Sequence, residues 1–235
     1  MLRLEPRAVP SRFMSWFSPV LAVLLTVVCG IILFTAVGKD PWTSLGVFFL
    51  EPIKDLRGWT EVGVKVAPLL LVSVGLAICF RANYFNIGAE GQLVIGAIAA
   101  GSVVLYFDHG EGGGAFFIAL ALAAGAVGGA VWGGIVAWLR DRYNANEILV
   151  SLMLVYVAQL LLSYLVHGVL MDPDGFGFPQ SRLFSDGFLL PMVIPGTRLH
   201  LGIVLALLAA LLGWVFMARS FSGFKLQVGG MAPRA

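Results

Sequence analysis

Charged side chains are scarce in this sequence. Asp, Glu, Lys and Arg make up only 12% of its 235 residues, whereas 59% of the residues are hydrophobic. The mean hydropathy of +0.93 is far from the usual balance of a soluble domain. This composition excludes a chain that folds mainly in contact with water and predicts an integral membrane protein.

Residues that carry catalytic or metal chemistry are also few. Cys29 and Cys79 both fall within apolar segments, so a disulfide framework, a CxxC redox pair and a zinc site are all unsupported. The sequence contains no Walker A, GxSxG or HExxH motif, and its three histidines are not spaced as metal ligands. We therefore expect no bound cofactor or metal, and no ATP hydrolysis by this chain alone.

Four long stretches contain no charged residue, and each is long enough to cross a hydrocarbon layer of about 30 Å as a helix. These stretches are residues 17–38, 115–139, 148–171 and 199–218. A fifth apolar region, residues 66–107, is interrupted by a polar segment. The pattern predicts an all-α, polytopic transmembrane helical bundle.

The basic residues lie beside these spans and are too dispersed, at a net charge of +2, to predict a nucleic-acid partner. By the positive-inside rule they place three regions in the cytoplasm. The residues concerned are Arg3, Arg7 and Arg12, then Arg140 and Arg142, then Arg219, Lys225 and Arg234. Residues 39–60 are expected to form an outer loop. Parity then requires two segments, at about 62–80 and 91–107, giving six membrane segments with both termini inside.

The polar interruption between these two segments contains Asn83, Asn86, Gly88, Glu90 and Gln92. One interpretation is a helix break inside the membrane, whose free backbone N–H groups and polar side chains line a solute path. The other is an ordinary cytoplasmic turn, with Asn86 capping the next helix and Glu90 in its first turn. Charge parity fits both interpretations equally.

Two further features concern packing within the bundle. Gly125, Gly129 and Gly133 recur at intervals of four, which predicts close packing against a neighbouring helix such as the one carrying Gly96 and Ala100. The amide of Gln159 lies within a predicted span and needs a hydrogen-bond partner there, so Gln159 is a candidate for lining the pathway.

The segment Phe85-Asn86-Ile87-Gly88-Ala89-Glu90-Gly91-Gln92-Leu93 resembles the FNIGAEGQL signature of bacterial ABC importer permeases of the branched-chain amino acid and ribose class. It is most similar to the subgroup for nucleosides and simple sugars. Asn146 to Leu154, with Asp172-Pro173 and Pro179-Gln180, agree with that subgroup. Residues 222–230 resemble the entry to the cytoplasmic loop that meets the ATPase.

The resemblance implies a permease subunit in the bacterial inner membrane that translocates nucleosides or simple sugars by alternating access. Its partners would be an ABC ATPase subunit that uses the ATP, a second permease subunit, an extracytoplasmic binding protein and the lipid bilayer. The implied pathway residues are Asn83, Asn86, Gly88, Glu90, Gln92 and Gln159, and the implied ATPase-coupling residues are Gly223, Phe224, Lys225 and Gly229.

Members of this class are typically longer, with a second, inverted set of spans. The resemblance therefore implies one truncated transmembrane permease domain over residues 1–235, with a cytoplasmic N-terminus (1–16), a membrane region (17–218) and the start of a coupling loop (219–235). Two alternatives stay open from the residues. A secondary transporter would use the same broken helix and Glu90 without an ATPase. An intramembrane enzyme would need a serine and a histidine together within the bilayer, and the histidines lie near span ends.

Overall fold

The computed structural model describes residues 11–110 and 112–231. Over these residues the chain folds into eight α-helices and one short 3-10 helix. Met192 and His200 form an isolated antiparallel β-bridge. Six of the described helices are long and apolar enough to cross a membrane. The predicted all-α bundle with six membrane segments is confirmed. Three of the arginines on which the predicted membrane orientation depends, Arg3, Arg7 and Arg234, lie outside the described residues.

The chain divides into two compact units, Met1–Gly63 and Val64–Ala235. The first unit contains α1 (Arg12–Ala36) and α2 (Pro41–Lys54), which pack on each other, and the first turns of α3 (Leu56–Arg81). Within this unit most hydrophobic side chains of α1 are exposed, and the helix is long and apolar enough to cross a membrane.

The prediction that residues 39–60 form a loop is wrong, because most of these residues are helical. Asp40 caps α2 by accepting a hydrogen bond from the Thr43 backbone N–H at 2.8 Å, and Pro41 occupies the first helical position. Both are ordinary helix-start signals. Glu51 and Lys54 interrupt the apolar residues of this segment, so α2 is not part of a long uncharged stretch.

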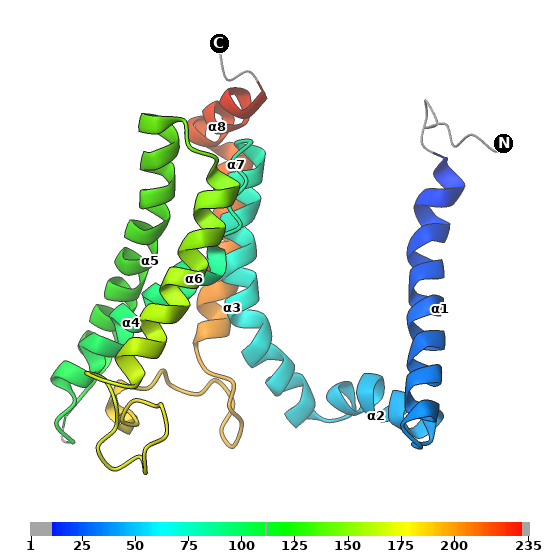
Figure 1. Ribbon diagram of the computed structural model, residues 1–235, viewed down its shortest axis with the longest axis horizontal. Helices are drawn as coiled ribbons and strands as arrows, with labels where there is room; N and C mark the ends of the chain where they lie inside the picture. Colours follow the sequence, from blue (N-terminus) through cyan, green and yellow to red (C-terminus); the bar gives the residue numbers. More distant parts are fainter. Residues whose placement is uncertain (1–10, 111, 232–235) are drawn as a thin grey trace. The chain divides into compact units, whose positions relative to one another are not determined.

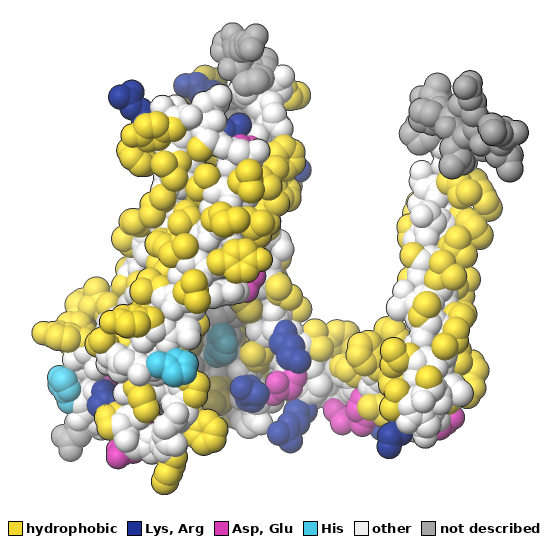
Figure 2. All heavy atoms as spheres, viewed as in Figure 1, with side chains coloured by type: hydrophobic (Ala, Val, Ile, Leu, Met, Phe, Trp, Pro, Cys, Tyr) yellow, Lys and Arg dark blue, Asp and Glu magenta, His cyan; other side chains and the backbone are white. Residues whose placement is uncertain are grey.

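The second unit is built on a tightly packed group of three helices, α4, α5 and α6 (Figure 1). Two further helices, α7 and α8, pack on each other, and α8 replaces the loop expected from residue 219. The bounds are α4 Ala89–Phe107, α5 Ala115–Tyr143, α6 Glu147–Val166, α7 Gly202–Arg219 and α8 Phe221–Met231. Figure 2 shows hydrophobic side chains over the flanks of these helices and basic side chains mainly near their ends.

Glycines bring the backbones of α4 and α5 into direct contact. A Cβ added at Gly96 would lie 2.9 Å from the Gly125 carbonyl oxygen, and one added at Gly125 would lie 3.3 Å from the Ala100 Cβ. A Cβ at Gly129 would lie 3.1 Å from the Gln92 carbonyl oxygen. The predicted packing of the glycine stripe on Gly96 and Ala100 is therefore confirmed.

Helix α4 begins well inside the group of helices that surrounds it. Gly91 packs against Val155, eight positions after α6 begins at Glu147, which is about 12 Å along a helix. Gln92 lies against Gly133, ten positions before α5 ends at Tyr143, or about 15 Å. The first turn of α4 therefore lies within the group of helices and not at its end. A non-helical segment that enters the bundle is what the broken-helix interpretation of the polar interruption requires.

The Gly96 contact predicts a stability difference between two glycine substitutions. Gly96→Ala should lower the melting temperature of the detergent-solubilised protein, because the added methyl overpacks a backbone contact at a cost of about 1–3 kcal/mol. Gly134→Ala is the matched control, since a Cβ at Gly134 meets nothing within 4 Å. Both changes give the same gain in helix propensity, so equal melting temperatures would contradict the packing argument.

Candidate functional site

The break between α3 and α4 starts with a left-handed residue. Asn83 has a φ of 54°, and the N–H groups of Asn83 and Tyr84 donate to the carbonyls of Phe80 and Cys79 at 3.1 and 3.0 Å. This pattern is the Schellman motif, in which asparagine tolerates the left-handed position that ends a helix. The exposed Asn83 thus has a structural role in turning the chain out of α3.

The middle of the break is fastened to α6. The buried Ser151 hydroxyl accepts a hydrogen bond from the Ile87 N–H at 3.3 Å, and the Asn86 Oδ1 accepts one from the Gly88 N–H at 2.9 Å. A Cβ at Gly88 would lie 2.9 Å from the Ser151 Cβ. Gly88 is therefore needed for close approach and not for an unusual backbone angle, since its φ is −85°.

The start of the break lies beside the ends of α5 and α6. The Arg140 guanidinium lies 5.0 Å from the centre of the Tyr84 ring and forms an ion pair of 3.0 Å with Glu147. Asn146 caps α6 through hydrogen bonds from the backbone N–H groups of Ile148 and Leu149. The chain thus enters at the Arg140 end and continues without helix to the start of α4.

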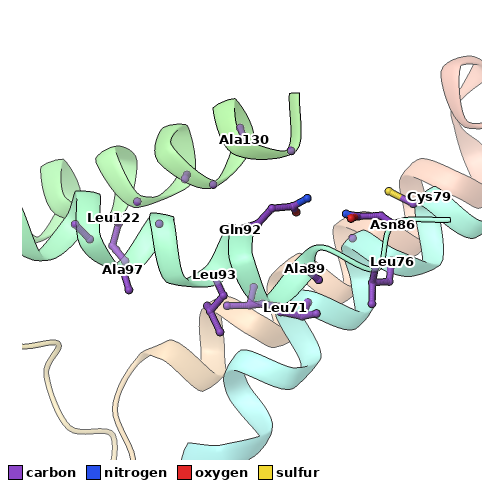
Figure 3. A pocket seen from close by; sticks show the side chains of 18 residues that line it. Leu71, Leu76, Cys79, Asn86, Ala89, Gln92, Leu93, Ala97, Leu122 and Ala130 are labelled. Carbon is purple, nitrogen blue, oxygen red and sulfur yellow. The ribbon is translucent and has the colours of Figure 1, made fainter. Parts of the chain in front are cut away.

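A groove of about 590 Å³ opens between α3, α4 and α5, a volume within the range of small-molecule sites. Its walls are mainly leucine, alanine and glycine, and none of the described residues that line it is charged. Asn86 and Gln92 supply amide groups, and Figure 3 shows these two side chains pointing toward each other. Asn86 comes from the break and Gln92 from the first turn of α4.

Glycines of α5 make room for the Gln92 side chain. A Cβ at Gly133 would lie 2.8 Å from the Gln92 Nε2 and 3.1 Å from its Cδ. The Gly125, Gly129 and Gly133 stripe therefore serves twice, because it packs against the α4 backbone and also lines the groove. The sequence pattern alone favours only the first of these roles.

Glu90 and Gln159 lie outside the groove lining and contact each other. The Gln159 Nε2 donates to the Glu90 Oε1 at 2.8 Å, joining the first turn of α4 to the middle of α6, and both side chains are exposed. The expected partner of the Gln159 amide is thus a carboxylate. Of the six predicted pathway residues, the structure brings Asn86 and Gln92 to the groove. Its lining does not include Asn83, Gly88, Glu90 or Gln159.

The predicted coupling residues are spread over α8. Gly223 is buried against α7, where a Cβ would lie 2.9 Å from the Met217 Cα. Phe224 is exposed, and the Lys225 Nζ lies 4.6 Å from the centre of the Phe221 ring. A Cβ at Gly229 would meet nothing within 4 Å.

Six candidate spans, a helix that begins within the bundle and an uncharged groove beside it define a multi-pass membrane protein with the features of a solute permease. Residues 60–235 match the family described as the permease component of branched-chain amino acid transport systems. The chain belongs to this family. No solved structure matches it.

Several characterised relatives are similar over most of the chain. The glucose ABC transporter permease protein TsgB13 of Haloferax volcanii is 36% identical over 97% of this chain and 62% of its own length. The guanosine ABC transporter permease protein NupP of Bacillus subtilis is 30% identical over 92% of this chain and 62% of its own length. The nucleoside ABC transporter permease protein NupB of Lactococcus lactis is 24% identical. The chain thus spans about 62% of the length of the first two relatives.

A buried carboxylate that sequence reasoning missed lies at the far end of α4. Asp108 is 2% exposed and accepts hydrogen bonds from the Ser185 hydroxyl, from the Ser185 N–H at 2.7 Å and from the Gly110 N–H at 3.1 Å. Arg182 donates to the carbonyl oxygens of Leu105 and Asp108, near the negative end of the helix dipole. This network ties the loop after α6 to the end of α4.

Acid should weaken this network. The Ser185 hydroxyl and backbone N–H hold the pKa of Asp108 below its usual value near 3.9. Because this pKa is lower in the folded state than in the unfolded state, the ionised Asp108 stabilises the fold. This stabilisation is fully present above the unfolded-state pKa, and it is lost as the pH falls through the folded-state pKa. Melting temperatures from pH 7 down to pH 3 should therefore drop for the wild type. Asp108→Asn should be less stable at pH 7 and should flatten this dependence, whereas the exposed Asp186→Asn in the same loop should keep it.

Proposed function

We propose that the chain is a permease component of an ABC importer for an uncharged polar solute of the nucleoside or simple-sugar class. The groove beside the broken helix carries this proposal. Its described lining offers two amides and no charge, which suits a neutral solute with several hydrogen-bonding groups. The relatives named for glucose, guanosine and nucleosides agree with this solute class.

The same groove argues against a branched-chain amino acid as the solute. An amino acid is a zwitterion, and each of its charges would need a counter-charge or a set of strong hydrogen bonds within the membrane region. Asn86 uses its side-chain oxygen on the Gly88 N–H, which leaves the amide N–H groups to donate. Gln92 supplies both a donor and an acceptor. Such a pair suits hydroxyls or the edge of a base better than an ammonium and a carboxylate.

Transport would use the break as its moving part. Non-helical backbone between two helices changes its dihedral angles more easily than a helix, so residues 82–88 are suited to alternating access. We assign Asn86 and Gln92 to the pathway on the groove face. The Glu90 and Gln159 pair would contribute from the adjoining face of α4 and α6, and Asn83 and Gly88 would hold the break in shape.

The partners follow from the same proposal. A separate ABC ATPase subunit would use the ATP and contact α8, where Phe224 and Lys225 are exposed. A second permease subunit and an extracytoplasmic binding protein would complete the importer. The protein would lie in the bacterial inner membrane with its N-terminus in the cytoplasm, because Arg140, Arg142 and Arg219 lie at or near the ends of helices that the positive-inside rule places there.

A secondary transporter is the second candidate, and the Glu90–Gln159 hydrogen bond favours it. A carboxylate within a membrane span is a common device of ion-coupled carriers. The two candidates separate by purification, since an importer permease binds an ATPase subunit and needs ATP for uptake. Uptake by the purified chain without an ATPase, driven by an ion gradient, would favour the carrier.

The proposal predicts which solutes the assembled importer accepts. In proteoliposomes that contain the complete complex, ATP should drive uptake of guanosine or glucose but not of leucine. Gln92→Leu should lower the apparent affinity about 2–10-fold, the equivalent of one lost hydrogen bond of about 0.5–1.5 kcal/mol. Leu93→Met, a volume-conserving change on the same groove, should leave uptake unchanged.

Cys79 offers a direct probe of the groove, because it is one of the lining residues. In a Cys29→Ala background, a thiol reagent should label Cys79, and the transported solute should slow this labelling. Leucine uptake at a rate equal to that of guanosine and glucose would contradict the proposed solute class. Labelling of Cys79 that no solute affects would remove the groove from the pathway.

A further inference from the structure

The first half of α8 is fixed to α7. Ser220 lies between the two helices and caps α8, its hydroxyl accepting a hydrogen bond from the Gly223 N–H at 2.9 Å. The Gln227 Nε2 donates to the Met217 carbonyl oxygen at 3.0 Å. Together with the close packing of Gly223 against Met217, these contacts hold the α7–α8 corner in one geometry.

The other end of α8 contacts the last residues of α3. A Cβ added at Gly230 would lie 2.7 Å from the Ala82 carbonyl carbon and 2.8 Å from the Arg81 carbonyl oxygen. No side chain separates the two backbones at this point. A hollow of about 440 Å³ is lined by Ala82 and Gly230, so the contact lies at its edge.

The contact lies directly before the break. Ala82 is followed by the left-handed Asn83, and the chain reaches the groove at Asn86. On the far side of Asn86, Ile87 and Gly88 are fastened to Ser151 of α6. A displacement applied at residues 81 and 82 must therefore be taken up between residues 83 and 86, because the chain is fixed again at residue 87.

We propose that Gly230 is a positioning residue for transport, passing movements of α8 to the break and so to Asn86 in the groove. This inference rests on the function proposed above. Two backbones in direct contact cannot shift independently, because interiors are packed without slack. A side chain at position 230 would push the backbones apart and weaken the link. Gly134 of α5 meets nothing within 4 Å and provides a matched control for a glycine-to-alanine change.

The test uses the complete importer complex in proteoliposomes, with Gly230→Ala and Gly134→Ala variants. Three quantities are measured: recovery of the ATPase subunit with the permease, basal ATP hydrolysis, and the stimulation of hydrolysis by a binding protein loaded with guanosine or glucose. Gly230→Ala should retain ATPase recovery and basal hydrolysis, and should reduce the stimulation by about fivefold or more, the size of a typical coupling between sites. Gly134→Ala should match the wild type in all three quantities.

The rate of Cys79 labelling gives a second readout. In the Cys29→Ala background, ATP should change this rate with the native glycine at position 230 and in Gly134→Ala, but not in Gly230→Ala. Normal stimulation in Gly230→Ala, equal loss in both variants, or failure of Gly230→Ala to assemble would each overturn the inference. A wild-type complex that binds no ATPase subunit would instead overturn the proposed function, so the two failures are distinguishable.

Discussion

The organisation of this protein depends on the direct backbone contact of α4 with its neighbours. Gly96 meets Gly125, and Gly129 meets the Gln92 backbone, with no side chain between them, and Gly91 brings α4 equally close to α6. In a membrane, helices gain little from hiding apolar surface, so close van der Waals contact and hydrogen bonds must hold them together. This packing allows α4 to begin inside the bundle, and the groove exists because α4 begins there.

Different kinds of interaction hold the two ends of α4. At one end, Asp108 lies outside the membrane span and is satisfied by charge-assisted hydrogen bonds from Ser185, which fix the following loop. At the other end, the break is held by the Ser151 hydroxyl and by the close approach of Gly88. The first end is strongly polar, whereas the second has few hydrogen bonds and follows a non-helical segment. The second is the end suited to movement.

Particular residues illustrate where sequence reasoning succeeds and where it fails. The spacing of Gly125, Gly129 and Gly133 predicts their packing partner, because residues four apart share one face of a helix. A glycine in a helix break is commonly needed for an unusual backbone angle, yet Gly88 has an ordinary φ and is needed for space. Helix α2 was expected as a loop, although Asp40 and Pro41 carry its start signal. Ser151 and Asp108 carry no local signal, because their partners are distant in sequence.

The sequence by itself determined the solvent, the number of spans, the interrupted hairpin and the glycine stripe. These features follow from composition and short-range periodicity, which act on neighbouring residues. Only the tertiary structure decided that the break lies within the bundle, that Asn86 and Gln92 face the groove, and that Glu90 pairs with Gln159. The physical reason is that these helices are apolar on nearly every face, so no polar stripe marks which side of a helix meets the groove.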